Sequence, residues 1–135
     1  MWKIKPALPL TLETTMSIKK MVDYLYQRFG RIDVFINNAG FGEFKSYDHY
    51  TSQEIRDMFD INTFATMTFS RLMAEKMVEQ GRGHIINIPV WRENCDSQLK
   101  CLCSDQVCCD WLLRCLRLEL ADKGVYVTTV KSWSN

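Results

Sequence analysis

Apolar and polar residues along the chain follow two alternating periods, one typical of helices and the other of buried strands. Residues 11–29 place apolar side chains at helical spacing, and Gly30 follows as a candidate C-cap. A short apolar run rich in β-branched residues then extends from Ile32 to a pair of asparagines that begins at Asn37. This order predicts an amphipathic helix that leads through a tight turn into a buried strand.

The same succession occurs twice more along the chain. Residues 52–80 form a second helical pattern, in which Thr51 or Ser52 can act as the N-cap with Glu54 in the first turn. The remaining patterns are those of a strand, a helix and a strand, over residues 84–88, 99–120 and 125–130. Three helix–strand pairs in succession predict an α/β fold with a parallel sheet and right-handed crossovers.

The composition fits a single domain of ordinary globular character. The chain has 135 residues, of which 47% are hydrophobic and 24% charged, and its net charge is +1. A balance so close to neutral gives no indication of nucleic acid or an anionic membrane as a partner. The N-terminus lacks the apolar core of a signal peptide, and no apolar run approaches the ~20 residues of a membrane span. We therefore expect a cytoplasmic protein.

A short motif at the end of the first predicted strand, together with three others, resembles the motifs of a known family. Residues 37–40 read Asn-Asn-Ala-Gly, in order with Phe-Gly-Arg-Ile-Asp at 29–33, Ile-Asn at 61–62 and Gly-His-Ile-Ile-Asn-Ile at 83–88. This set resembles the classical short-chain dehydrogenases/reductases, which are NAD(P)-dependent oxidoreductases. The resemblance implies a partial Rossmann-like, doubly wound parallel sheet of about three strands with flanking helices, corresponding to the family's fourth to sixth strands.

The resemblance also implies roles for four residues. Asn37, Ala39 and Gly40 would line the adenosine side of an NAD or NADP site. Asn62 would interrupt its helix and hold a water in the proton relay. Without the resemblance, Asn37 and Asn38 can simply cap a strand end, and Asn62 can be a helix irregularity.

Two parts of the family's machinery have no counterpart in the sequence. No glycine cluster before Asn37 could cradle a pyrophosphate on backbone N–H groups at a helix N-terminus. The positions of the family's catalytic tyrosine and lysine hold Leu102 and Gln106, and the serine position falls near Pro89 or Val90. Since a leucine cannot transfer a proton and a glutamine supplies no charge, we expect a chain without catalytic turnover.

The cysteines mark a break in composition. All 6 lie between Cys95 and Cys115, whereas all 7 methionines lie at or before Met77. We therefore divide the single incomplete domain, residues 1–135, into family-like and divergent parts. The family-like parts are residues 11–88 and 116–130, and the divergent parts are a cysteine-rich stretch, 89–115, and a tail, 131–135.

We hypothesise that the divergent stretch is translated in a shifted reading frame. Codons exist for residues 100–107 that, moved by one base, encode Val-Tyr-Ala-Pro-Thr-Lys-Phe, with the tyrosine and lysine at the family's positions. The gene sequence tests this directly. Codons at Leu102, Cys103 and Gln106 that do not permit the shifted reading would refute it.

Other interpretations of the cysteines and histidines are weaker. Cys101-x-Cys103 and the adjacent pair Cys108-Cys109 lack the paired spacing of zinc ligands, and neither His49 nor His84 is near in sequence, so we expect no metal site. Disulfides are not expected without secretion, and thiols that are buried or partly exposed are the favoured interpretation. We assign no function to either histidine.

Two hypotheses of function remain. In the first, the chain is a truncated oxidoreductase-family member whose intact relatives exchange a hydride between NAD(P) and an alcohol or carbonyl substrate. In the second, it is a pseudoenzyme that acts as a protein-interaction module by self-association or by pairing with a full-length homologue. The strand that begins at Ile32 is expected at an open sheet edge, which predicts marginal stability.

Overall fold

The computed structural model describes residues 15–40, 46–88 and 100–130 of the chain. These residues form three helix–strand pairs in the predicted order, and the α/β class is confirmed. The elements are α1 (Thr15–Phe29), β1 (Val34–Asn37), the 3-10 turn η1 (Tyr47–His49), α2 (Ser52–Phe59), the π-helical segment η2 (Asp60–Ala65), α3 (Thr66–Glu79), β2 (Gly83–Asn87), α4 (Lys100–Leu120) and β3 (Val125–Thr129).

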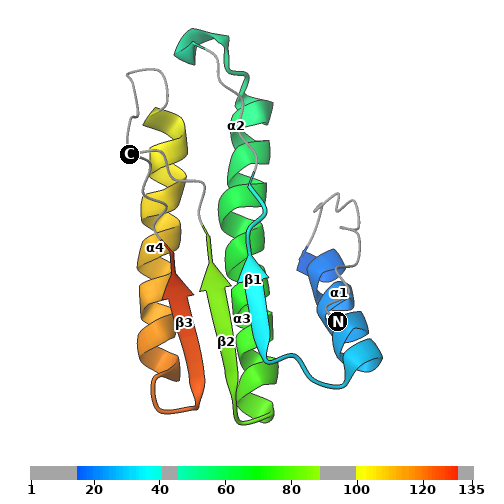
Figure 1. Cartoon of the computed structure of the whole chain (residues 1–135). Coiled ribbons are helices and arrows are strands. Elements are labelled where there is room, and N and C mark those ends of the chain that lie inside the picture. The colour runs from blue at the N-terminus through cyan, green and yellow to red at the C-terminus, as the bar shows by residue number, and fades with distance from the viewer. Residues whose placement is uncertain (1–14, 41–45, 89–99, 131–135) are drawn as a thin grey trace.

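The three strands form one parallel sheet in the order β1-β2-β3 (Figure 1). Among the described residues, β1 thus lies at an edge of the sheet, as predicted. The register pairs Val34 with His84 at one end of β1 and Asn37 with Asn87 at the other. The two asparagines therefore lie side by side, where β1 and β2 end.

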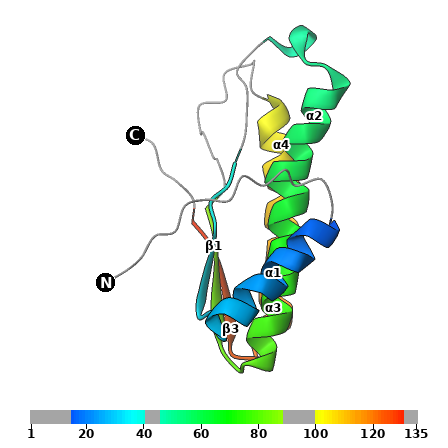
Figure 2. The same cartoon turned by 90° about the vertical axis from the view of Figure 1, so that its right-hand side faces the viewer.

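All the long helices cover the same face of the sheet, as Figure 2 shows with the strands seen nearly edge-on. The hydrophobic core lies between this helical layer and the sheet. Its members come from α1, η2, α3, the end of α4 and the strands: Ile18, Val22, Ala65, Phe69, Leu72, Met73, Ala74, Met77, Ile85, Leu120, Val125 and Val127. The regular spacing of these apolar residues is why the sequence alone predicted the elements.

Local signals begin and end the helices where the sequence predicted. The N–H of Gly30 donates to the carbonyl of Tyr26 at 2.8 Å, and its φ of 71° is the left-handed conformation of a glycine C-cap. Of the two candidate N-caps, the structure selects Thr51. Its side chain accepts from the N–H of Glu54, whose carboxylate in turn accepts from the N–H of Thr51, a complete capping box.

The long helix predicted over residues 52–80 runs without a gap from Ser52 to Glu79, but it is not α-helical throughout. It contains η2, a six-residue π-helical segment in which Asn62 and Thr63 are buried. Short polar residues compete with the helical hydrogen-bond ladder, and π-helical turns are rare in helices and frequent at functional sites. The π-helical segment at Asn62 fits both predictions for this residue, the asparagine that the resemblance implies and a simple irregularity of the helix.

The divergent stretch is described only in part. Residues 89–99 and 131–135 lie outside the described residues, and of residues 100–108 only the backbone is described. Leu102 and Gln106 fall in the first turns of α4. Within residues 15–40, 46–88 and 100–130, no helix combines the length and the apolar character that crossing a bilayer requires.

Candidate functional site

The carboxyl ends of β1 and β2 bring three polar side chains together under the helical layer. Asn37 and Asn87 are the last residues of their strands and are paired in register. Both point to the face that the helices cover, where α3 contributes Ser70 from above. Ligands of open parallel sheets bind at this end of the strands, so the cluster is the natural starting point for a site.

Hydrogen bonds connect the three side chains into one network. The amide nitrogen Nδ2 of Asn37 donates to Ser70 Oγ at 2.9 Å and to Asn87 Oδ1 at 2.7 Å. The Ser70 hydroxyl lies 3.4 Å from the same Asn87 oxygen. Both hydrogens of the Asn37 amide are therefore used inside the protein, and its Nδ2 has none left for a ligand.

Asn87 is the least satisfied member of this network. It is only 2% exposed, and its Nδ2 has no hydrogen-bond partner in the structure. A buried donor without a partner costs about 1–3 kcal/mol, so the rest of the network must compensate for this loss. The network joins β1, β2 and α3 below the loop that follows Asn37.

The other residues of the predicted site lie in two places. Asn38, Ala39 and Gly40 are exposed and follow β1 without regular structure, so this loop presents its backbone at the sheet's carboxyl edge. Asn62 is buried in η2, which packs against α4. The structure thus joins Asn37 to Ser70 and Asn87, and it places Asn62 on a separate element.

Sequence reasoning missed Ser70 and gave Asn87 no role. A signal for Ser70 exists: it stands three residues before Met73 and seven before Met77, on the face of α3 that these buried methionines define. A small polar residue on an apolar helix face needs a buried partner. The helix pattern does not say which residue this partner is, because the register of the sheet determines which side chains lie below Ser70.

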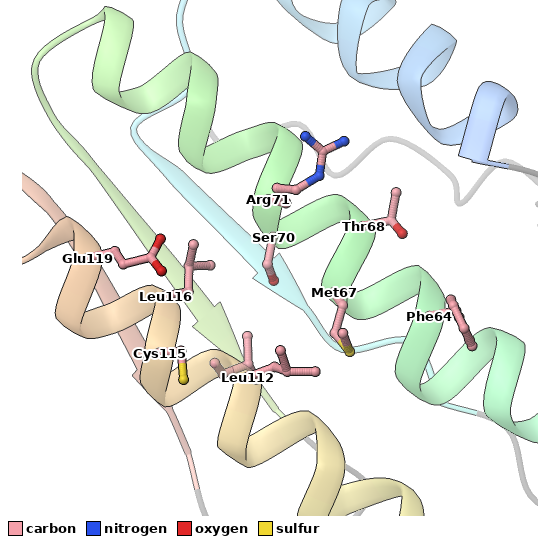
Figure 3. Close-up of a pocket in the computed structure, with 10 residues that line it drawn as sticks. Phe64, Met67, Thr68, Ser70, Arg71, Leu112, Cys115, Leu116 and Glu119 are labelled. Atoms are coloured by element: carbon pink, nitrogen blue, oxygen red, sulfur yellow. The ribbon is translucent and has the colours of Figure 1, made fainter.

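A hollow lies between α3 and α4, with the sheet behind it (Figure 3). It has a volume of about 370 Å³. Its wall is mostly apolar, and Arg71 and Glu119 line it from opposite helices. The remaining lining residues are Phe64, Met67, Thr68, Ser70, Leu112, Leu113, Cys115 and Leu116.

The described residues offer little acid–base or metal chemistry at either place. No group of three or more His, Cys, Asp or Glu side chains among them could hold a metal ion. Of the cysteine side chains that are described, Cys109 is buried and Cys115 half-buried, and neither forms a disulfide. Burial raises the pKa of the Tyr26 phenol, with further increases from Asp33 and Glu79, but Tyr26 lies in α1, near the opposite end of β1.

The described residues can form only part of a dinucleotide-binding site. The loop 38–40 can form one wall, but its side chains are an amide and a methyl group with no charge for a phosphate. The described glycines with φ near +70° to +80°, Gly30, Gly81 and Gly124, follow helices and do not lead from a strand into a helix.

Comparisons with known proteins identify the family. The family model for short chain dehydrogenases matches residues 6–132. A ketoacyl reductase of Nostoc, HetN, is 35% identical over 82 residues, which is 61% of this chain and 29% of that protein. The 7alpha-hydroxysteroid dehydrogenase of Escherichia coli is 24% identical over 120 residues, which is 88% of this chain and 47% of the enzyme.

Solved structures give the same result. A metagenomic short-chain oxidoreductase in complex with NADP aligns with a TM-score of 0.81 and 26% identity, over 90% of this chain and 56% of that one. A short-chain dehydrogenase of Streptomyces avermitilis aligns with a TM-score of 0.81 and 25% identity, over 92% of this chain and 46% of that one. This chain thus spans about half the length of these proteins.

Proposed function

Because this chain belongs to the short-chain dehydrogenase family, we propose that it is an oxidoreductase-fold protein that does not turn over substrate on its own. Intact relatives exchange a hydride between a nicotinamide cofactor and an alcohol or carbonyl substrate. In this proposal the chain retains one wall of the cofactor site and has lost the groups that move the proton. It acts in the cytoplasm.

One observation carries the proposal. The positions that match the family's tyrosine and lysine hold Leu102 and Gln106, and both fall in α4, the helix against which η2 packs. A hydrocarbon and a neutral amide provide neither a proton donor nor a charge to lower its pKa. The polar cluster that is present consists of two amides and a hydroxyl, Asn37, Asn87 and Ser70, none of which titrates near neutral pH.

The roles of the retained residues follow from this picture. The loop at Ala39 and Gly40 would contact the adenosine side of NAD or NADP through its backbone. Asn37 would act on the cofactor indirectly, by fixing the start of that loop through Ser70 and Asn87. Asn62, buried in η2, would be a remnant of the family's proton relay.

Activity of the purified chain tests the proposal. The chain would be incubated with NADH or NADPH and with carbonyl compounds that its relatives' names suggest, a ketoacyl compound and 7-oxo glycochenodeoxycholic acid. We expect no oxidation of the reduced nicotinamide, and a Kd for NADP above about 1 mM by calorimetry. The E. coli 7alpha-hydroxysteroid dehydrogenase is the positive control, and turnover by this chain above a no-enzyme blank would refute the proposal.

A double variant tests which missing part matters more. Leu102→Tyr with Gln106→Lys restores the residue types that the resemblance calls for in α4. We expect the variant to remain inactive, because the described residues still offer no cradle for the cofactor's phosphates. Measurable turnover by the variant alone would show that the cofactor site is complete without such a cradle.

The hollow between α3 and α4 favours a second candidate function, an interaction module. Phe64 is 65% exposed beside it, and Trp111 and Leu118 of α4 are also largely exposed. Exposed apolar side chains near a mostly apolar hollow with charged residues in its wall are typical of protein–protein contact. The partner in this candidate is a full-length homologue or a second copy that packs the same helices.

Analytical ultracentrifugation of two variants tests whether the hollow is a protein–protein interface. Phe64→Glu places a charge at the hollow, whereas Tyr24→Glu adds the same charge at a comparably exposed aromatic residue of α1. If the hollow is an interface, only Phe64→Glu lowers the sedimentation coefficient or abolishes capture of the homologue. A wild-type chain that is monomeric and binds no homologue would contradict the candidate.

A further inference from the structure

The wall of the hollow between α3 and α4 contains a carboxylate without an ion-pair partner. Glu119 of α4 lines the hollow. Within residues 15–40, 46–88 and 100–130, no Lys, Arg or His side chain forms an ion pair with it. Figure 3 shows the Glu119 carboxylate extending from α4 towards α3. This carboxylate can therefore accept a cation from outside the chain.

The positive charge on the opposite wall is already balanced. The Arg71 guanidinium of α3 forms an ion pair with Glu75, one turn further along the same helix. In Figure 3 this guanidinium extends away from α4, out of the gap between the two helices. Because the charge of Arg71 is neutralised by Glu75, the unbalanced charge of the hollow is the negative charge of Glu119.

Apolar side chains extend along the hollow from this carboxylate. Leu112 and Leu116 come before Glu119 on α4, and Met67 of α3 and Phe64 of η2 line the other side. The helix rises by about 10 Å between Leu112 and Glu119. The volume of about 370 Å³ is at the small end of ligand pockets, which range from roughly 300 to 1,000 Å³. The hollow thus has room for a small elongated molecule whose end meets a negative charge.

We propose that the hollow binds a small organic cation with an apolar body about 10 Å long and an ammonium group at one end. The apolar body lies against Met67, Leu112 and Leu116 and removes their surface from water. The ammonium group forms a charge-assisted hydrogen bond with the Glu119 carboxylate. A molecule of the same shape that ends in a hydroxyl gains only the first contribution, and one that ends in a carboxylate is repelled.

Three probes that share one apolar body test the proposal. They are 4-phenylbutylamine, which is a cation at neutral pH, the neutral 4-phenylbutanol and the anion 4-phenylbutanoate. Calorimetry with the full chain should give a Kd for the amine at least about fivefold lower than for the alcohol, and a still higher Kd for the carboxylate. The preference for the amine should shrink when salt is raised from about 0.1 M to about 1 M, because the Debye length falls from about 10 Å to about 3 Å.

Two variants with the same change of charge separate Glu119 from the net charge of the chain. Glu119→Gln keeps the shape of the side chain and removes its charge. Asp48→Asn removes the same charge at an exposed carboxylate of η1 that does not line the hollow. We expect Glu119→Gln to raise the Kd of the amine at least about fivefold and to leave that of the alcohol unchanged. Asp48→Asn should change neither value.

The thiol of Cys115 reports whether the amine lies in the hollow. Cys115 lines the hollow, is half-buried and forms no disulfide. Its rate of alkylation by iodoacetamide can be followed by mass spectrometry of the peptide that contains it. A saturating concentration of the amine should slow this alkylation in the wild type. At the same concentration, Glu119→Gln should show less protection of Cys115, because less amine is bound.

Four outcomes would overturn the proposal. The first is the absence of amine binding, which is also the result if a protein partner already fills the hollow. The second is equal affinity for the amine, the alcohol and the carboxylate. The third is an equal effect of Glu119→Gln and Asp48→Asn, and the fourth is a bound amine that leaves Cys115 unprotected. The proposal goes beyond the loss of turnover proposed above, and none of these outcomes depends on catalysis, so either can fail while the other holds.

Discussion

The polar side chains of Asn37, Ser70 and Asn87 form one hydrogen-bond network at the carboxyl end of the sheet, so the loss of one leaves the others without a partner. Asn37 gives both amide hydrogens to Ser70 and Asn87, which come from a helix and a neighbouring strand. The geometry fixes the point at which the loop after Asn37 leaves the sheet. A substitution here therefore affects the stability of the fold and the position of the loop together.

Removal of the central acceptor should be costly. Asn87→Ala deletes the oxygen that accepts from Asn37 and leaves the Asn37 and Ser70 groups buried with fewer partners. We expect the free energy of unfolding, measured by urea denaturation, to fall by about 1 kcal/mol, because removal of the unpaired Asn87 Nδ2 offsets part of the loss of the acceptor. Asn38→Ala, at an exposed position of the same loop, is the control and should change it by less than about 0.5 kcal/mol. Equal losses would show that the network contributes little.

Tyr26 should make stability depend on alkaline pH. Its hydroxyl is buried without a partner, and burial together with the carboxylates of Asp33 and Glu79 raises its pKa above the usual value of about 10. Since the unfolded chain loses this proton first, the stability contributed by neutral Tyr26 is present below about pH 10 and is lost as pH rises towards the folded-state pKa. Tyr26→Phe should therefore unfold less readily than the wild type at high pH. Parallel stability curves for the two proteins from about pH 9 to about 11 would contradict this.

Glycine is required for different reasons in two of the turns that connect a helix to a strand. Gly30 and Gly124 have nearly equal φ angles, 71° and 73°, and each precedes a strand after a helix. A Cβ on Gly30 would meet nothing within 4 Å, whereas a Cβ on Gly124 would lie 2.6 Å from the carbonyl oxygen of Gly81. The backbone of one turn thus packs against the other, and only one of these two glycines is needed for space.

This matched pair separates conformational strain from crowding. Gly30→Ala should lower the free energy of unfolding by about 1–2 kcal/mol, the cost of a left-handed conformation for a residue with a Cβ. Gly124→Ala should lower it by at least about 1 kcal/mol more, because a neighbouring carbonyl must also move. Thermal unfolding followed by circular dichroism measures both. Equal effects would mean that the backbone at Gly81 can move away from the new Cβ without a loss of stability.

In the part of the molecule that the structure describes, the sheet has one covered face and one open face. Its helices bury a continuous core on one side, while Val34, Ile36 and Tyr126 remain exposed on the other. A three-stranded sheet with an apolar edge strand is prone to intermolecular pairing. This arrangement is the physical basis for expecting marginal stability in the isolated chain.

A charge on the open face should therefore reduce aggregation without changing the fold. Ile36→Lys places an ammonium group beside the outer edge of β1, a device that natural sheets use against aggregation. We expect a higher temperature of aggregation onset by light scattering, with an unchanged far-ultraviolet circular dichroism spectrum. Tyr24→Lys on α1, at a similarly exposed position, controls for net charge and should have a smaller effect. Equal improvement by both variants would assign the effect to charge alone.

The sequence by itself determined the local features of this protein. Apolar spacing predicted the helices and strands, Gly30 and Thr51 marked helix ends, and the residues 37–40 indicated the family. These features are readable because they depend on neighbours a few positions apart. The tertiary structure decided the rest: the π-helical turn at Asn62, the pairing of Asn37 with Ser70 and Asn87, and the open face beside β1. Each depends on which distant segments meet, and sheet register and crossover handedness fix this only in the folded chain.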